Sequence, residues 1–219
     1  LLLHRLPDVY SCPVVTEERM LPLAERQSSR ALWVVDPLDG TQNFINRDGE
    51  FSINIALLVD NTPVLAAIAV PATLTVYLGA AGIGAWKAVQ GSCEPLAPTQ
   101  VDGDIRVVDS KLPTAGGREA TERFCRLNGI DAAQVARVGS AAKLAYLAEG
   151  KFDLALRYDR LWEWDVAAAD CILNAVGCSL LNIDTGLPIS YNSTESMELP
   201  GFIAAQQWIS LSQLDSDEA

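Results

Sequence analysis

The chain has 219 residues, of which 49% are hydrophobic and 20% are charged, an ordinary balance for a globular protein with a substantial core. Its formal net charge of −12 repels polyanions, and no cluster of Lys and Arg interleaved with aromatic residues offsets it, which excludes binding to a nucleic-acid polymer. The apolar stretches are too short to cross a bilayer, and no secretory leader is recognisable. We therefore expect a soluble, cytoplasmic protein without an integral membrane segment.

The cysteine and histidine content limits the kinds of metal site and catalytic mechanism that this chain can have. Five scattered cysteines are odd in number and never closely paired, which argues against a disulfide framework or a zinc knuckle and favours buried thiols. The single histidine, His4, lies in an N-terminal segment that we expect to be frayed. Ser-His-Asp and Cys-His catalytic sites and histidine-rich zinc sites are therefore not expected. Acid–base chemistry must then use carboxylates, hydroxyls or metal-bound water.

The first predicted strand, residues 32–35, leads into the most informative motif of the chain. Asp36 ends the strand, Pro37 forces a turn, and Gly40 lets the backbone approach a ligand with its N–H groups free; the motif is Asp36-Pro37-Leu38-Asp39-Gly40-Thr41. The alternative is a plain surface turn in which Asp39 caps the next helix. Residues 51–59, 64–70 and 74–78 then predict an antiparallel meander, followed by a turn at Gly82 into another strand.

Residues 93–104, rich in Pro, Gly and Asp, predict a loop between two subdomains, 1–104 and 105–219, which we expect to form one unit with the functional site between them. The second half alternates strands at 105–108, 135–138, 152–156, 178–183 and 202–205 with helices at 117–127, 139–148 and 164–177. This alternation predicts sheets sandwiched between helices, an α/β or α+β layered fold.

The carboxylates of the motif indicate a metal site. Asp36 and Asp39 cannot both stay ionised at close range without a cation, and oxygen ligands with no His or Cys nearby favour Mg²⁺ or Mn²⁺ over zinc. Glu17 and Asp165 are candidates to join them, and the Leu38 carbonyl is a further possible ligand. Taken singly, Glu17-Glu18 reads as a solvated loop pair and Asp165 as a helix cap.

In this order the motifs resemble the lithium-sensitive, magnesium-dependent phosphatases that include inositol monophosphatase and 3'(2'),5'-bisphosphate nucleotidase. The resemblance runs from Val14 to Ala205 and rests on residues 17–18, 36–41 and 164–168. Within that family, residues 46–57, 139–143 and 148–150 are most similar to the bacterial bisphosphate nucleotidase branch. The resemblance implies a five-layer αβαβα fold of the inositol-monophosphatase type, here with its N-terminal helices missing.

The resemblance also implies an activity: magnesium-dependent removal of the 3'-phosphate of adenosine 3',5'-bisphosphate, a product of sulfate assimilation, to give AMP and phosphate. An inositol or sugar phosphatase is the alternative enzyme, and a catalytically silent member that binds metal or nucleotide is the alternative of another class. Two or three Mg²⁺ ions are implied, with Mn²⁺ as a substitute and Li⁺ and Ca²⁺ as inhibitors. The partner is a small phosphorylated nucleotide, and the chain is a monomer or a homodimer.

By resemblance, one metal is held by Glu17, Asp36 and the Leu38 carbonyl, and a second by Asp36, Asp39 and Asp165. Such a pair activates a water molecule for attack and stabilises the leaving oxygen. The catalytic residues implied are Thr41, Glu17 and Asp39, with Thr41 orienting the water. Substrate contacts are assigned to Gly40, Thr41, Gly139, Ser140 and Lys143, although Lys143 reads equally as a solvated helix lysine. Trp162 and Trp164 are candidates for stacking on adenine, but aromatic residues near a helix start more often belong to the core.

Two features depart from the family pattern. An upstream stretch usually supplies an aspartate that pairs with the threonine corresponding to Thr41, and nothing before Glu17 provides it. Because the chain starts at Leu1 rather than at Met, we expect the natural start to lie upstream. Gln42-Asn43 replaces the Lys-Glu usual in the bacterial nucleotidases, and Asn43 resembles the inositol phosphatases instead.

Overall fold

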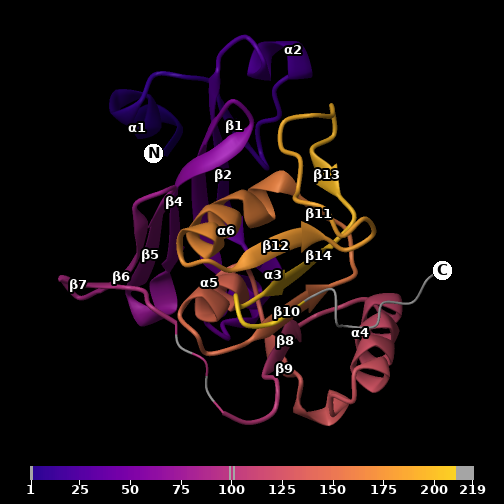
Figure 1. Cartoon of the computed structure of the whole chain (residues 1–219). Coiled ribbons are helices and arrows are strands. Elements are labelled where there is room, and N and C mark those ends of the chain that lie inside the picture. Colours follow the sequence, from indigo (N-terminus) through magenta and orange to yellow (C-terminus); the bar gives the residue numbers. More distant parts are fainter. Residues whose placement is uncertain (1, 99, 101, 211–219) are drawn as a thin grey trace.

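The computed structural model describes residues 2–98, 100 and 102–210 (Figure 1). Its first sheet has seven strands in simple chain order, β1 to β7. All neighbouring pairs are antiparallel except β1 and β2, which run parallel. The predicted meander is therefore present. The strands are β1 (Val14–Thr16), β2 (Ala31–Asp39), β3 (Ser52–Val59), β4 (Thr62–Val70), β5 (Thr75–Ala80), β6 (Gly84–Val89) and β7 (Ser92–Pro95).

The second sheet has five strands in the order β12-β14-β10-β8-β9. Three neighbours, β10, β8 and β9, are parallel, so their carboxyl ends meet at one edge of the sheet. Its strands are β8 (Val107–Ser110), β9 (Ala136–Val138), β10 (Leu154–Arg157), β12 (Ser179–Asn182) and β14 (Phe202–Ala205). A further two-stranded sheet joins β11 (Leu161–Trp162) and β13 (Glu198–Leu199).

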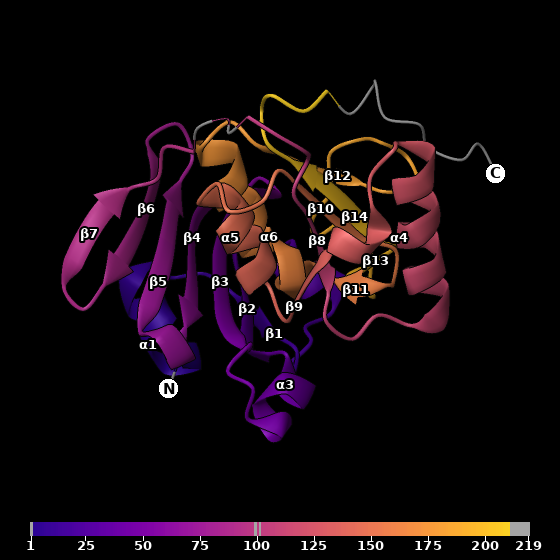
Figure 2. The ribbon, with the colours of Figure 1, turned by 90° about the horizontal axis from the view of Figure 1, so that it is seen from below.

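Helices separate and cover the sheets. Figure 2 shows α5 and α6 between the two large sheets, with α4 on the outer face of the second and α1 behind the first. The longer helices are α1 (Leu2–Val9), α4 (Ala115–Leu127) and α6 (Glu163–Ala175). The shorter ones are α2 (Leu23–Arg26), α3 (Thr41–Asn46) and α5 (Ala142–Ala148), with 3₁₀ turns at Pro71–Thr73 and Ala132–Gln134. This is the layered α+β fold expected from the sequence.

Three apolar clusters fill the spaces between the layers. The largest joins α5 and α6 to both sheets, the second lies between the five-stranded sheet and α4, and the third lies under α1. Helix α6 is buried almost all round, as expected for a helix covered on both sides. Gly79 of β5 permits its close approach, because a Cβ there would lie 2.8 Å from Cγ1 of Ile172.

Several predicted boundaries were wrong. Strand β2 does not end at Asp36 but continues to Asp39 after an irregularity in its pairing with β3. The loop expected from residue 93 begins with β7, since residues 92–95 extend the meander by one antiparallel edge strand. Strand β8 begins two residues later than expected, and α5 begins at Ala142 rather than at Gly139. The start of the chain, which reads as frayed, forms α1.

Other features of the chain agree with its composition. No helix within the described residues is long and apolar enough to cross a membrane. All five cysteines are free thiols: Cys125, Cys171 and Cys178 are buried, whereas Cys93 is exposed. The division of the chain at residue 104 stays a prediction.

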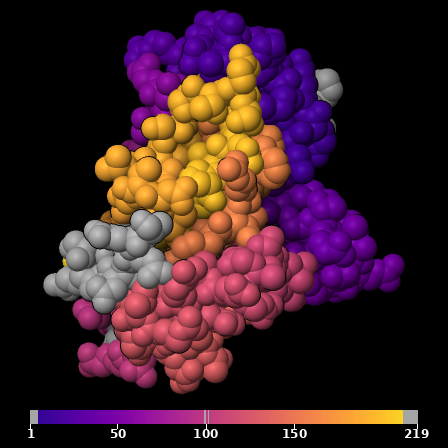
Figure 3. Space-filling view, turned by 90° about the vertical axis from the view of Figure 1, so that its right-hand side faces the viewer, coloured from indigo at the N-terminus to yellow at the C-terminus, as the bar shows by residue number. Residues whose placement is uncertain are grey.

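Figure 3 shows the orange and yellow C-terminal segments at the centre of one face, with indigo N-terminal segments above them.

Candidate active site

Parallel pairing of β1 with β2 brings the first two predicted ligands together. Thr16 lies opposite Val35 in this ladder, so Glu17 and Asp36, the next residue of each segment, lie at the same end of the β1–β2 pair. Asp36 is buried, and its Oδ1 accepts a hydrogen bond from the backbone nitrogen of Leu38 at 2.9 Å. After Asp36, Pro37 and Leu38 lie opposite the single residue Ile53, so β2 carries one extra residue before Asp39 pairs with Ser52. This local bulge turns both carboxylates of the motif toward one cavity.

Gly40 makes the turn from β2 into α3. Its φ of +84° is left-handed, a conformation that favours glycine, and a Cβ at this position would lie 3.1 Å from the carbonyl oxygen of Glu50. Thr41 follows as the first residue of α3, and its hydroxyl donates to the Leu38 carbonyl at 3.2 Å. The predicted turn and helix start are thus realised in the motif.

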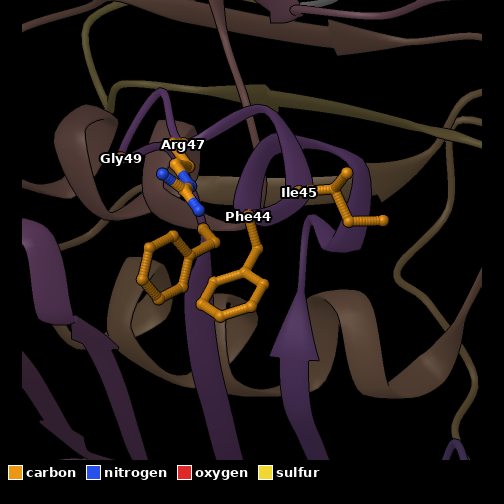
Figure 4. A pocket seen from close by; sticks show the side chains of 5 residues that line it. Phe44, Ile45, Arg47 and Gly49 are labelled. Carbon is orange, nitrogen blue, oxygen red and sulfur yellow. The ribbon is translucent and has the colours of Figure 1, made fainter.

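The far side of α3 forms a separate apolar hollow. Phe44 packs edge-on against Phe51 with ring centroids 5.0 Å apart, and Phe44 and Ile45 stay 50% and 64% exposed (Figure 4). The five residues that line this hollow differ from those that line the acidic cavity. The hollow is therefore not part of the candidate site.

The second sheet closes the cavity from the other side. The cavity has a volume of about 300 Å³ and receives the ends of β8 and β10 and the turn after β9. It is lined by Glu17, Asp36, Leu38, Asp39, Gly40, Thr41, Gln42, Asn43, Ser110, Lys111, Leu112, Gly139, Ser140, Lys143, Arg157, Trp162, Trp164 and Asp165. Every site residue named from the sequence is in this set, drawn from both sides of residue 104.

A tight group of three carboxylates forms the floor of the site. One carboxylate oxygen each from Asp36, Asp39 and Asp165 lie within 4.8 Å of one another. Burial, and then the charge of Asp39, raise the pKa of Asp36 to about 8 and that of Asp165 to about 7. Carboxylates in this state are stabilised by a divalent cation, and an all-oxygen set suits Mg²⁺ or Mn²⁺. The residues present fit such an ion.

Glu17 lies at the rim of this group. It is exposed, it lines the cavity, and it is not one of the three carboxylates that lie within 4.8 Å of one another. Burial raises its pKa, and the neighbouring charges of Glu18 and Asp39 add to the effect. Glu17 therefore shares the negative field of the site.

Asp165 both caps a helix and belongs to the acidic group, the two alternatives that the sequence left open. It lies in the first turn of α6, where its Oδ2 accepts the backbone N–H of Trp162 at 2.9 Å, and its carboxylate also belongs to the acidic group. The adjacent indoles of Trp162 and Trp164 stack with centroids 6.0 Å apart and planes 4° apart. Trp164 is buried in the core, whereas Trp162 is 43% exposed.

The side chains of Lys143 and Arg157 line the cavity, and their positive charges act on Asp165. Lys143 is buried in α5 and its Nζ donates to the Ser140 carbonyl at 2.7 Å. Burial, and then the charge of Arg157, lower the pKa of Lys143 to about 8. The reading of Lys143 as a solvated lysine is wrong, because α5 packs between the two sheets.

Gly139 and Ser140 form the turn that brings α5 to the motif. The Gly139 nitrogen donates to Glu50 Oε2 at 2.8 Å, and a Cβ at Gly139 would lie 2.6 Å from the Glu50 carbonyl oxygen. Ser140 has a left-handed φ of 53° and is buried. Only a residue without a side chain fits at Gly139.

Sequence reasoning missed three polar lining residues, Ser110, Lys111 and Arg157, and the apolar Leu112. Lys111 forms ion pairs with Asp48 at 3.0 Å and with Glu50 at 3.2 Å. A usable signal existed for Arg157, since it ends the apolar run 154–156 just as Asp36 ends the run 32–35. Polar residues at the carboxyl ends of neighbouring strands tend to share a site.

Comparison with known proteins agrees with this arrangement. The model of the inositol monophosphatase family matches residues 1–214. The 3'(2'),5'-bisphosphate nucleotidase CysQ of Aggregatibacter actinomycetemcomitans is 34% identical over 196 residues, which cover 87% of this chain and 70% of the relative. CysQ of Escherichia coli K12 is 34% identical over 199 residues, covering 90% and 75%.

A solved structure of CysQ from Bacteroides thetaiotaomicron, a bacterial member of the same family, superposes with a TM-score of 0.79 at 30% identity. The match covers 91% of this chain and 79% of that one. Membership carries with it a dependence on divalent metal, which the acidic group accommodates. The chain belongs to the inositol monophosphatase family.

Proposed function

We propose that this chain is a magnesium-dependent phosphomonoesterase that removes the 3'-phosphate of adenosine 3',5'-bisphosphate to give AMP and phosphate. The observation that carries the proposal is the meeting of Asp36, Asp39 and Asp165 beside the cations Lys143 and Arg157 in one cavity. Relatives named as 3'(2'),5'-bisphosphate nucleotidases support the choice of substrate.

Divalent cations neutralise the charge of the acidic group and the phosphate and act as Lewis acids on the phosphate oxygens. Glu17, Asp36 and the Leu38 carbonyl would hold one ion, and Asp36, Asp39 and Asp165 a second. We propose two or three Mg²⁺ ions, replaceable by Mn²⁺ and antagonised by Li⁺ and Ca²⁺. The carboxylate donors support the binding of divalent cations, since the buried carboxylates of Asp36 and Asp165 need a compensating positive charge.

The protein's own groups orient the reactants. Thr41 keeps its hydroxyl hydrogen on the Leu38 carbonyl, which leaves the lone pairs of its oxygen to accept a hydrogen bond from the attacking water. The backbone N–H groups of Gly40 and Thr41 are assigned to the reacting phosphate. Glu17 and Asp39 act beside them, with Asp39 fixed by Ser52 at 3.2 Å and by Asn54 at 3.1 Å.

The second phosphate of the substrate is assigned to the cations. Arg157 lines the cavity, and its buried Nε has no partner in the described part of the protein. A guanidinium with a spare donor is well suited to phosphate. Lys143 adds positive charge, while Gly139 and Ser140 form the wall next to it. A bisphosphate uses these groups more fully than a monophosphate does.

The test is phosphate release by the purified chain with Mg²⁺ from adenosine 3',5'-bisphosphate and from inositol 1-phosphate. We expect the bisphosphate to react with a kcat/KM at least about tenfold higher, because its second phosphate gains a charge-assisted contact. Equal or reversed rates would identify an inositol or sugar phosphatase. Binding of Mg²⁺ and nucleotide without any release would identify a catalytically silent member.

The free state of all five cysteines supports a cytoplasmic location, where thiols stay reduced. The enzyme is proposed to act as a monomer or a homodimer, and sedimentation velocity separates the two. Inhibition by Li⁺ at fixed Mg²⁺ tests the proposed antagonism directly.

A further inference from the structure

Two buried polar side-chain atoms lack a hydrogen-bond partner within the described residues: the Ser110 hydroxyl and the Arg157 Nε. Both residues line the acidic cavity. Ser110 is only 7% exposed. A buried polar group left unpaired is costly, and native proteins rarely keep one without a reason. Two such atoms in one cavity indicate a ligand that pairs with both.

One wall of the cavity, called the substrate wall below, consists of Arg157, Ser110 and the turn at Gly139 and Ser140. The topology of the second sheet places Ser110 at the centre of this substrate wall. In the parallel ladder Leu156 lies opposite Asp109, so Arg157 and Ser110 follow side by side on β10 and β8. On the other side Ser110 lies opposite Val138, the residue before Gly139. Ser110 therefore stands between a cation and the turn that carries Gly139 and Ser140.

An ion-pair network holds this wall in position. Lys111, next to Ser110, bridges Asp48 and Glu50 of the first half, and Glu50 Oε2 also accepts the Gly139 N–H. On the other flank the Ser110 nitrogen donates to Asp109 Oδ1 at 2.6 Å. The backbone of Ser110 is thus fixed from both sides while its hydroxyl stays unused.

We propose that Ser110 is a specificity-determining residue that donates its hydroxyl hydrogen to the second, non-reacting phosphate of the substrate, beside Arg157. The inference rests on the proposed function and adds a residue to it. A phosphate oxygen accepts a hydrogen bond from a buried hydroxyl and neutralises part of the neighbouring guanidinium charge. Binding of this phosphate therefore satisfies both unpaired atoms at once.

The experiment compares Ser110→Ala with the wild type on adenosine 3',5'-bisphosphate and on adenosine 3'-monophosphate, with Mg²⁺. We expect the KM for the bisphosphate to rise about tenfold, the size of a lost hydrogen bond to a charged group. The KM for the monophosphate, which lacks the second phosphate, should change by less than about twofold. The melting temperature should stay equal or rise, because alanine removes an unpaired hydroxyl.

Thr75→Val is the matched control. Thr75 carries a buried hydroxyl on β5, does not line the cavity, and donates to the Thr73 carbonyl at 3.2 Å. Its loss should lower the melting temperature and leave both KM values unchanged. A Ser110→Ala variant with the wild-type KM for the bisphosphate, with equal losses on both substrates, or with only a lower melting temperature would overturn the proposal.

Failure of the proposed function is recognised separately. If the wild type does not hydrolyse the bisphosphate, the proposed nucleotidase activity is wrong. The proposed contact between Ser110 and the second phosphate is then tested by thermal shift. The rise in melting temperature that adenosine 3',5'-bisphosphate gives the wild type should shrink in Ser110→Ala if the contact exists. An equal rise in both proteins, or none in the wild type, would refute it.

Discussion

The carboxylate of Asp39 accepts a hydrogen bond from the backbone nitrogen of Ala141, although the two residues lie 102 positions apart in the chain. Asp39 ends β2 of the first sheet, and Ala141 immediately precedes α5. The same Oδ2 atom also accepts hydrogen bonds from Ser52 and Asn54. One carboxylate oxygen therefore joins the proposed metal-binding motif to the turn proposed to contact the substrate.

Asp36→Asn is expected to lower kcat/KM by at least about 100-fold, because it removes a charge from the group proposed to hold the cations. The stabilisation that Mg²⁺ gives the folded protein, about 2.7 kcal/mol at one hundred times its Kd, should be lost as well. Thermal melts with and without Mg²⁺ measure the second effect. Asp104→Asn, an exposed carboxylate outside the cavity, serves as control. Near-normal turnover in Asp36→Asn would show that the ligand assignment is wrong.

Mg²⁺ binding at pH 7 should release protons. The pKa of Asp36 is raised to about 8 and that of Asp165 to about 7, both above their values in the unfolded chain. Without metal, their contribution to stability is therefore full below about pH 4 and is lost as the pH rises through about 7 to 8. The Mg²⁺-induced rise in melting temperature should accordingly grow with pH. Calorimetry in buffers of different ionisation enthalpy measures the protons, and buffer-independent heats would contradict the expectation.

Lys111→Met is expected to raise the KM for the bisphosphate a few-fold while changing the stability little, because the ion pairs of Lys111 are partly exposed and screened by solvent. Lys111→Arg should restore the KM, since it can still bridge Asp48 and Glu50. Arg30→Met breaks a solvent-exposed ion pair remote from the cavity and should leave the KM unchanged. Steady-state kinetics and urea unfolding provide the two measurements. No change in KM for Lys111→Met would show that this network does not position the substrate wall.

Trp162→Ala tests whether the exposed indole at the cavity rim contacts a base. Stacking of a base on an aromatic side chain contributes about 1–3 kcal/mol, so the KM for the nucleotide should rise about fivefold or more. The KM for inositol 1-phosphate, which has no base, should stay constant. Equal changes for both substrates would indicate a general disturbance of the α6 start rather than base recognition.

Asp170→Asn should change the pH dependence of stability. Asp170 is buried in α6, accepts hydrogen bonds from the Tyr191 hydroxyl at 2.9 Å and from Asn174 Nδ2 at 2.6 Å, and has its pKa raised to about 6 by burial. Its contribution to stability is full below about pH 4 and is lost as the pH rises through about 6.

Relative to the wild type, Asp170→Asn should therefore gain roughly 1–2 kcal/mol between pH 5 and pH 8, measured by urea unfolding. Asp60→Asn is a control of opposite sign, because its hydrogen bond to Arg30 lowers the pKa of Asp60 and its contribution is lost only as the pH falls. A parallel pH dependence for Asp170→Asn and the wild type would contradict the assigned shift.

The sequence alone predicts the acidic motif, the meander that follows it and the layered fold class. These depend on local chemistry: alternating apolar residues build strands, and Pro37 and Gly40 mark a turn wherever they occur. It also indicated Glu17 and Asp165 as partners of the motif, through their order along the chain. Residues 139–143 were assigned to the substrate only through resemblance.

The identity of the other groups that share the cavity depends on long-range contacts. Ser110 and Arg157 are neighbours because β8 and β10 run parallel, a pairing that no local pattern encodes. The burial of Lys143 follows from the packing of α5 between two sheets, and that burial, rather than the residue type, lowers its pKa. The motif could therefore be predicted from the sequence, whereas the second wall of the site depends on contacts between distant strands.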